Sequence, residues 1–553
     1  MTSWPQQYQP LGPVFSVIAA MLPLIVLLGG IGLARLKPYV AALLALAAAL
    51  GIAIAVFGMP APFAVSAAAF GAAYGLLPIG WIVLNIIFLY QLVDSAGQFD
   101  VLRDSITGVT ADSRLQLLLI AFCFGAFFEG AAGFGAPVAV TGAMLIGLGF
   151  TRLQASGLSL IGNTAPVAFG ALGVQTVSLA SVSGLPLLAL SATVGRLLTP
   201  FCLLVPVWLV VAYAGWRRAL GVWPAILVAG GSYAASQLAI SNLHGPWLAS
   251  IVPALISAVA LVLFLRLWRP RSIMAVGEAS LVQGDAPAPP IERESGRPSP
   301  AALRRAWLPW LILTALIFLW GLPTIKGWLD GVFKLAIPFP DLDGRILRVP
   351  PVVTRPVVEA AIYTFNPLSA TGTAILLAAI AAGAVLRIPA AAMARTYGRA
   401  LVTVWPSLLT IAAMLALGNL TRFSGLDATM GLAFAATAGA YPFFGTMLGW
   451  LGTAVTGSDT ASNVLFGSLQ RITAEQLHLS PVLMASANSA GGVMGKMIDT
   501  QSIVVASTAT GWFGQESRIL RYVFVHALAL GALVGLTVLL LAYVPPFTLL
   551  VAG

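Results

Sequence analysis

Long apolar runs recur from one end of this 553-residue chain to the other, and they constrain its fold more than any other feature. Each run is about 20 residues long, the length that a helix needs to cross a hydrocarbon core of about 30 Å. Only 8% of the residues are charged, against roughly a quarter in a soluble domain, so the chain cannot cover itself with a polar surface. We therefore predict an all-α polytopic membrane protein with about 12 to 14 transmembrane helices in the lipid bilayer.

The formal net charge of +10 does not indicate nucleic-acid binding. The Arg residues lie in short loops between apolar runs, where the excess of basic residues in cytoplasmic loops explains them. Cys123 and Cys202 lie within apolar runs, and no CxxC or Cys/His cluster occurs, so we expect no disulfide and no metal site. An enzyme is also disfavoured, because the chain has no paired His, HExxH, GxSxG or nucleotide-binding loop.

Basic residues indicate which ends of the predicted helices face the cytoplasm. Arg35 and Lys37 follow the first apolar run, about 12–34, and Arg518 and Arg521 precede the last one. Since cytoplasmic loops are rich in Lys and Arg, both termini are expected on the outer side of the membrane. The opening MTSWPQQYQPLGP has no basic n-region and is not expected to be a signal peptide.

Two polar segments interrupt the apolar pattern. Residues 266–306 are rich in Pro, Ser and charge, and they predict a flexible cytoplasmic linker between an N-terminal half, 1–265, and a C-terminal half, 307–553. Residues 326–365 mix charges of both signs with apolar residues. This second segment predicts a small external cap or an amphipathic hairpin.

The stretches 127–184 and 443–511 are unusually rich in Gly, Asn, Ser and Thr, and they look like copies of each other. The first opens FFEGAAGFGAPVAVTG and the second FFGTMLGWLGTAVTGSDTASN, and Asn163 aligns with Asn488. The helices that precede them are predicted to run in opposite directions. We therefore predict two inverted repeats with broken or re-entrant helices, a plan that places substrate and coupling ion near the membrane centre.

Four long motifs, FFEGAAGFGAPVAVTGAMLIGLGF, IGNTAPVAFGALG, TGSDTASNVLFG and NSAGGVMGKMIDTQSIVVA, resemble those of the L-lactate permease family of bacterial proton-coupled transporters. The resemblance covers essentially the whole transmembrane chain. It implies symport of a small 2-hydroxymonocarboxylate, such as L-lactate or glycolate, with a proton and no other cofactor. The resemblance also implies a bacterial inner membrane, so both termini are expected in the periplasm. It also implies a transport domain that moves against a scaffold.

Four charged residues remain deep in the two stretches once loops, linker and span ends are set aside: Glu129, Asp459, Lys496 and Asp499. A lone charge at the bilayer centre costs at least about 2.5 to 3.5 kcal/mol, so each should face protein, water or a partner. Glu129 is predicted to carry a proton, with a purely structural acid as the alternative. Lys496 is predicted either to bind the substrate carboxylate or to pair with Asp499, and the spacing of three residues favours the pair.

Asp459 lies among hydroxyl and amide side chains, which could relay protons or form an oxygen cage for Na+. We assign proton coupling to Glu129, Asp459 and Asp499. The predicted substrate-binding residues all lie in the two stretches. Their side chains can bond to a carboxylate or hydroxyl or, for Gly, leave backbone N–H groups accessible. They are Asn163, Thr164, Asn488, Ser489, Gly491, Gly492, Lys496 and Gln501. Hydrogen bonding between helices and, for Gly, close helix packing are the alternative roles.

The sequence favours a proton-coupled monocarboxylate symporter. A Na+-coupled carboxylate symporter and a passive organic-anion channel are the alternatives, and a channel would need a continuous polar pore. The expected partners are a small carboxylate substrate and the bilayer, and a monomer and a homodimer are equally compatible with the sequence.

Overall fold

The structure is a computed structural model that describes residues 3–32, 34, 36–107, 109–131, 133, 136–276, 299–512 and 515–551. Most of the predicted linker, from residue 277 to 298, lies outside these residues. The first half contains the helices α1 (Pro13–Gly32), α2 (Pro38–Ala55), α3 (Ala61–Tyr74), α4 (Trp81–Ser95), α5 (Gln98–Thr107), α6 (Ser113–Leu117), α7 (Gly125–Ala131), α8 (Ala136–Gly147), α9 (Arg152–Gly162), α10 (Val174–Ser183), α11 (Leu187–Ala214), α12 (Trp216–Ala219), α13 (Trp223–Leu243) and α14 (Ile251–Leu267).

The second half is also helical, with its strands confined to one segment. Its helices are α16 (Pro300–Gly321), α17 (Pro323–Val332), α18 (Thr371–Val385), α19 (Ala390–Ser424), α20 (Leu426–Phe434), α21 (Tyr441–Thr456), α22 (Asp459–Gln476), α23 (Pro481–Gly495), α24 (Thr500–Ala509) and α25 (Glu516–Tyr543). The π-helical segments Gly75–Gly80 and Leu118–Phe124 join α3 to α4 and α6 to α7.

The helical membrane-protein class predicted from the apolar runs is confirmed. In the described part of the chain, nine helical segments are long and apolar enough to span a membrane, and four shorter apolar helices accompany them. The number of complete crossings stays a prediction. Their apolar side chains point outward as well as inward, as Phe15 and Val402 do with 68% and 72% exposure; a bilayer rather than water suits such a surface.

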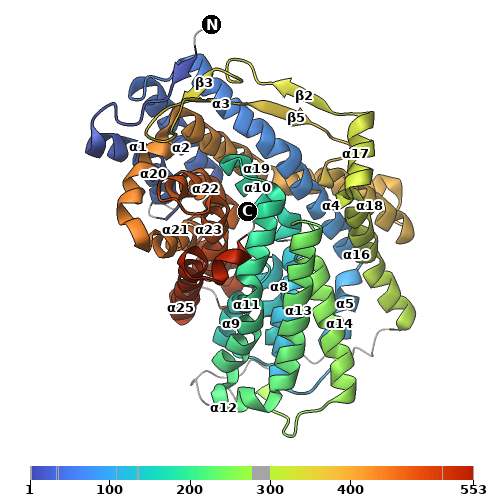
Figure 1. The fold of residues 1–553 in the computed structure, drawn as a ribbon. Helices are drawn as coiled ribbons and strands as arrows, with labels where there is room; N and C mark the ends of the chain where they lie inside the picture. Colours follow the sequence, from blue (N-terminus) through green and yellow to red (C-terminus); the bar gives the residue numbers. More distant parts are fainter. Residues whose placement is uncertain are drawn as a thin grey trace.

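The segment 326–365 contains the end of α17 and four short strands, β2 (Leu335–Pro338), β3 (Ile346–Arg348), β4 (Val357–Glu359) and β5 (Ile362–Phe365). β2 pairs antiparallel with β5, and β3 pairs antiparallel with β4 and parallel with β1 (Trp4–Pro5) at the N-terminus. These strands and the N-terminus lie at one end of the helical body, and α12 lies at the other (Figure 1). We call 326–365 the cap.

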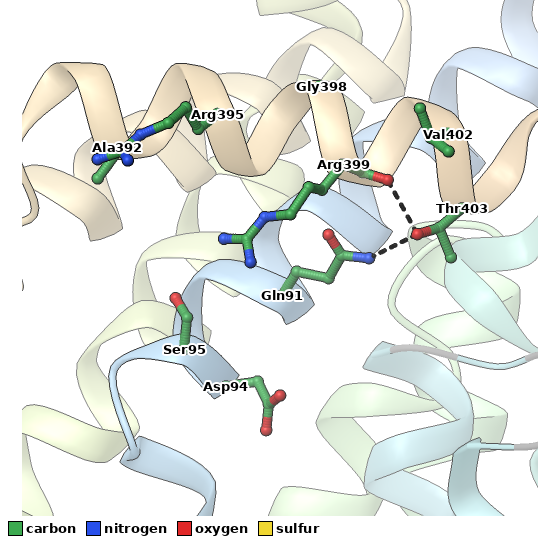
Figure 2. A pocket seen from close by; sticks show the side chains of 9 residues that line it. All are labelled: Gln91, Asp94, Ser95, Ala392, Arg395, Gly398, Arg399, Val402 and Thr403. Atoms are coloured by element: carbon green, nitrogen blue, oxygen red, sulfur yellow. Dashed lines mark hydrogen bonds between the residues drawn. The ribbon is translucent and has the colours of Figure 1, made fainter.

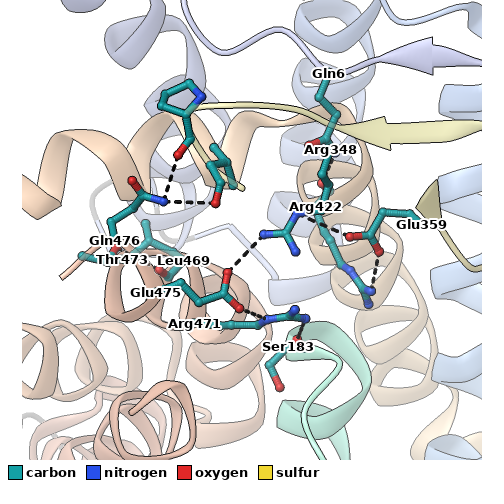
Figure 3. A network of polar contacts seen from close by, with 12 residues as sticks. Gln6, Ser183, Arg348, Glu359, Arg422, Leu469, Arg471, Thr473, Glu475 and Gln476 are labelled. Atoms are coloured by element: carbon teal, nitrogen blue, oxygen red, sulfur yellow. Dashed lines mark hydrogen bonds and ion pairs between the residues drawn. The ribbon is translucent and has the colours of Figure 1, made fainter. Parts of the chain in front are cut away.

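Ion pairs fix the cap to the ends of α19 and α22, and a hydrogen bond joins α22 to the end of α10 (Figure 3). Glu359 of β4 lies 2.9 Å from Arg422 of α19 and 3.5 Å from Arg348 of β3, and Arg348 lies 3.3 Å from Glu475 near the end of α22. Arg471 of α22 lies 2.8 Å from Glu475 and donates to the carbonyl oxygen at the end of α10. The ends of α10, α19 and α22 therefore lie at the cap end of the molecule.

The opposite end is held by Arg114 at the start of α6. Its guanidinium lies 2.6 Å from Asp112 and donates to the carbonyl oxygens of Arg218 and Ser272 at 2.8 and 2.7 Å. From this end, α6 and α7 run inward and α8 packs back against α7. By contrast, α21 begins near the cap end, where Tyr441 donates to Gln470 of α22, and α22 ends beside the cap. The inverted relation between the two stretches stays a prediction.

Helices α21 and α23 are packed backbone to backbone through glycine. A Cβ at Gly491 would overlap the carbonyl oxygen of Thr446, and a Cβ at Gly495 would overlap that of Trp450. Gly449 makes the same kind of approach in the other direction. Small residues permit such contact between membrane helices, so these two helices form one tightly packed unit.

Candidate functional site

Helix breaks bring the two special stretches together inside the molecule. In the second stretch, α21 ends before Gly457, whose φ of 73° is the left-handed value that commonly ends a helix. Ser458 then begins α22 by accepting a hydrogen bond from the Ala461 N–H. Asp499 begins α24 in the same way, accepting from the Ser502 N–H at 2.7 Å. The sequence thus caps two helix N-termini with polar side chains.

The first stretch is broken in a similar manner. α9 ends at Gly162, and residues 163–170 form turns before α10 begins at Val174. Gly170 and Gly173 have φ values of 43° and 78°, which residues with a Cβ rarely adopt. Asn463 of α22 donates to the carbonyl oxygen of Gln175 at 3.4 Å, which joins the two stretches. Helix N-termini that lie inside the protein attract anions, because their first N–H groups lack helical partners.

Lys496 and Asp499 form the ion pair that their spacing favours. The Lys496 Nζ lies 2.9 Å from Oδ2 of Asp499 and donates to the carbonyl oxygen of Gly457 at 2.7 Å. Their side chains are 13% and 0% exposed. Asp499 Oδ2 has no aligned hydrogen bond in the described residues, so the pair leaves acceptor capacity on the carboxylate.

Glu129 of α7 is buried and accepts a hydrogen bond from Asn163 Nδ2 at 3.0 Å. It also lies within range of the charges of Lys496 and Asp499. Asn163 Oδ1 is buried without a hydrogen-bond partner among the described residues. The acid of the first stretch and the charged pair of the second therefore belong to one cluster.

Asp459, the first residue of α22, is surrounded by donors. Its carboxylate accepts from Ser489 at 3.0 Å, from Asn463 at 3.2 Å and from Thr453 at 3.4 Å. Lys496 also acts on it electrostatically. The four deep charges predicted from the sequence thus lie in one region, which we call the charge cluster: Glu129, Asp459, Lys496 and Asp499.

The uncharged predicted residues occupy different places around this cluster. Asn488 donates to Asn463 Oδ1 at 3.0 Å, and therefore reaches Asp459 only through that amide. Thr164 donates to the carbonyl oxygen of Ile161 at 2.7 Å, within its own helix end. These contacts are hydrogen bonds within the protein, and the predicted substrate contacts of both residues remain predictions.

The remaining predicted residues surround the second helix break. The Gln501 side chain approaches Gly457. A Cβ at Gly492 would overlap Asp459 Oδ1, whereas Gly491 packs against α21. The absence of a side chain at Gly492 therefore leaves room for the Asp459 carboxylate, and its absence at Gly491 leaves room for the backbone of α21.

The sequence does not single out two buried polar residues that the structure shows. Asn463 links Asp459, Asn488 and the Gln175 carbonyl. Asp427 is buried at the start of α20, and its Oδ1 has no hydrogen-bond partner among the described atoms. Its flanking SGLDATMG, small and apolar around one acid, is the signal that could have identified it.

The sequence profile of the L-lactate permease family matches residues 16–545. The chain belongs to the L-lactate permease family. It is 44% identical to the glycolate permease GlcA of Escherichia coli K12, over 98% of this chain and 99% of that protein. It is 42% identical to the L-lactate permease of Salmonella typhimurium, with the same coverage. It is 41% identical to the L-lactate permease of Bacillus subtilis, over 96% of this chain and 97% of that protein.

Among solved structures, this L-lactate permease family member is similar to MtrF of Neisseria gonorrhoeae, described among antimetabolite efflux pumps. The TM-score is 0.49 at 11% identity, over 94% of this chain and 97% of that one. Membership of a permease family agrees with the apolar helices and places the chain among multi-pass membrane proteins. The charge cluster contains the three buried carboxylates that the structure describes in the two special stretches.

Proposed function

We propose that this protein takes up L-lactate and related 2-hydroxymonocarboxylates such as glycolate by proton symport across the bacterial inner membrane, with the charge cluster as its binding and coupling site. The observation that supports this most is the position of Lys496 at a helix break, where it pairs with the buried Asp499 and interacts electrostatically with the buried Glu129 and Asp459. Relatives named for L-lactate and glycolate support the substrate class.

The chemistry around Lys496 matches the two polar groups of such a substrate. A carboxylate would bind the ammonium and the N–H groups at the start of α24, whose cap residue is Asp499. A 2-hydroxyl is a donor and needs an acceptor. Asn163 Oδ1 is a buried acceptor without a hydrogen-bond partner among the described residues. Leaving such a group unpaired costs about 1 to 3 kcal/mol, so a hydroxyl that bonds to it would gain binding energy.

The formal charge of the cluster supports coupling to a proton. Three carboxylates and one ammonium give −2 when Glu129, Asp459, Asp499 and Lys496 are all ionised. A substrate anion would make this charge more negative in a region of low dielectric, where charge repulsion is strong. Uptake of one proton with the anion keeps the total unchanged. Substrate and proton therefore favour each other's binding, which is the condition for symport.

Sodium coupling is the alternative that the Asp459 surroundings were expected to permit. Ser489, Asn463 and Thr453 all donate hydrogen bonds to this carboxylate. They direct hydrogen atoms at it, whereas a Na+ site needs several oxygen lone pairs directed at one point. This arrangement favours protons.

Uptake of labelled substrate into proteoliposomes tests the proposal. L-lactate and glycolate should accumulate when the outside is acidified, and acetate, which lacks the 2-hydroxyl, should accumulate less. Replacing Na+ with K+ at fixed pH should change nothing. Loss of uptake in K+ would establish sodium coupling, and equilibration without accumulation under a pH gradient would establish a passive channel.

A further inference from the structure

A polar pocket lies far from the charge cluster in the chain, between the last turns of α4 and the first half of α19 (Figure 2). Its volume is about 960 Å³. The lining combines basic, amide and hydroxyl side chains with one acid: Gln91, Asp94, Ser95, Ala392, Arg395, Gly398, Arg399, Val402 and Thr403. The proposed transport function uses none of these residues.

Two arginines in this pocket have no acidic partner in the part of the chain that the structure describes. Arg399 donates to Thr396 Oγ1 at 3.0 Å, and Arg395 donates to the Ala391 carbonyl oxygen at 3.3 Å, both within α19. No ion pair within the described residues includes either arginine or Asp94. The pocket therefore has a formal charge of +1 and guanidinium N–H groups that remain available. Arginine presents these donors in a planar fork that suits phosphate oxygens.

Exposed apolar side chains follow the arginines along α19. Leu401, Val402 and Trp405 are 45%, 72% and 50% exposed. The Trp405 ring lies 5.9 Å from that of Tyr39 at the start of α2, and such aromatic residues gather where a membrane meets water. Arg395 and Trp405 are separated by about 15 Å along the helix axis at 1.5 Å per residue. The helix thus presents a cationic site and, one to three turns away, an apolar strip.

The pocket also lies at the end of the molecule that carries basic loops. α4 leads directly into α5, and α6 begins with Arg114 at the end opposite the cap. Arg305 near the start of α16 donates to the Leu386 carbonyl oxygen, just before α19. The distribution of basic residues predicts that this end faces the cytoplasm, whose leaflet carries anionic lipid.

We propose that this pocket binds an anionic phospholipid, with the headgroup phosphate on Arg395 and Arg399 and an acyl chain along Leu401, Val402 and Trp405. Gln91 and Thr403, which are hydrogen-bonded at 3.2 Å, add amide and hydroxyl groups for the glycerol part. The lipid would join α4 to α19, two helices that also pack against each other directly. A soluble phosphate would use the arginines but not the apolar strip.

Native mass spectrometry of the full chain released from mixed micelles tests this proposal. The protein is incubated with phosphatidylglycerol or with phosphatidylcholine, which has the same acyl chains and no net charge. Phosphatidylglycerol should be retained preferentially. The double variant Arg395→Gln/Arg399→Gln should weaken its retention about 30-fold, since each basic residue contributes about 1 kcal/mol and 1.4 kcal/mol is a factor of ten.

The matched control is Arg217→Gln/Arg304→Gln, which removes the same charge from exposed residues near other helix ends and should change retention less than threefold. A second variant, Val402→Ser, keeps both arginines and should weaken phosphatidylglycerol without affecting inorganic phosphate. If the control variant lost phosphatidylglycerol as strongly as the Arg395→Gln/Arg399→Gln variant, the proposal would be overturned. It would also be overturned if millimolar inorganic phosphate displaced bound phosphatidylglycerol as effectively as added phosphatidylglycerol does. Circular dichroism identifies any variant that fails to fold. If the double arginine variant does not fold, phosphatidylglycerol retention by Val402→Ser tests the proposal instead.

Discussion

The Nζ of Lys496 lies 2.9 Å from Oδ2 of Asp499, and the two residues lie on either side of the break between α23 and α24. The cation therefore neutralises an acid that is completely buried, and it stays close to a helix N-terminus. Structural pairing and substrate binding are compatible, because an ammonium group has three donors and the pair and Gly457 account for two. These two roles can be separated by experiment.

Lys496→Ala should reduce both stability and substrate affinity. Removing one partner of a buried pair typically costs about 3 to 5 kcal/mol, while loss of a charge-assisted hydrogen bond of about 1.5 to 3 kcal/mol raises the half-saturating lactate concentration at least about tenfold. Lys496→Ala/Asp499→Asn should recover much of the thermal stability but none of the affinity. Recovery of both stability and affinity would show that Lys496 is only a structural partner. Lys326→Ala, at an exposed lysine, is the control and should change neither.

Glu129→Gln should separate transport from coupling. The amide keeps the size of the side chain but cannot carry a proton as a carboxylate does. Counterflow of labelled lactate between equal concentrations should persist, and accumulation under an imposed pH gradient should be lost. Asn163→Ala removes the donor to Glu129 and the proposed hydroxyl acceptor but keeps the acid, so it should raise the half-saturating lactate concentration and still accumulate lactate at saturating substrate. Uphill uptake by Glu129→Gln would exclude this residue as the proton carrier.

Gly491→Ala should destabilise the protein by at least about 1 to 3 kcal/mol, the usual cost of overpacking. The added Cβ would overlap the Thr446 carbonyl oxygen of α21, which cannot move independently of its helix. Gly51→Ala is the matched control, because that helical glycine has open space around it, and alanine there should stabilise by up to about 1 kcal/mol. Thermal unfolding in detergent compares them; equal stability of both variants would contradict the packing described for α21 and α23.

The cap network should depend on acid pH. Burial alone would raise the pKa of Glu359, but the charges of Arg422 and Arg348 outweigh it and hold the pKa below its ordinary value of 4.5. A lowered folded pKa contributes stability that is present above about 4.5 and is lost as pH falls through the folded value. The melting temperatures of the native protein and Glu359→Gln should therefore differ at pH 7 and converge below pH 4.5. A difference that grows on acidification would refute this account.

Much of the helical architecture could be predicted because a bilayer imposes a length and a polarity on every crossing segment. The four residues of the charge cluster could be selected for the same reason, since a deep charge is costly wherever it lacks a partner. Asn463 and Asp427 were harder to find. A neutral amide costs little free energy at any position in a membrane helix, so its position does not indicate a function. Asp427 follows the end of α19 so closely that it resembles a loop residue. The strands of the cap depend on pairing with the distant N-terminus, which a local pattern does not contain.

The backbone contact between α21 and α23 also limits how this molecule can change shape. Gly457 follows α21, Lys496 follows α23, and a hydrogen bond joins these two residues. Because glycine of one helix lies against a carbonyl oxygen of the other at Gly449, Gly491 and Gly495, sliding of α21 along α23 would bring backbone atoms into collision. Any rearrangement that exposes the proposed anion site first to one side of the membrane and then to the other must therefore move both helices together as one rigid unit.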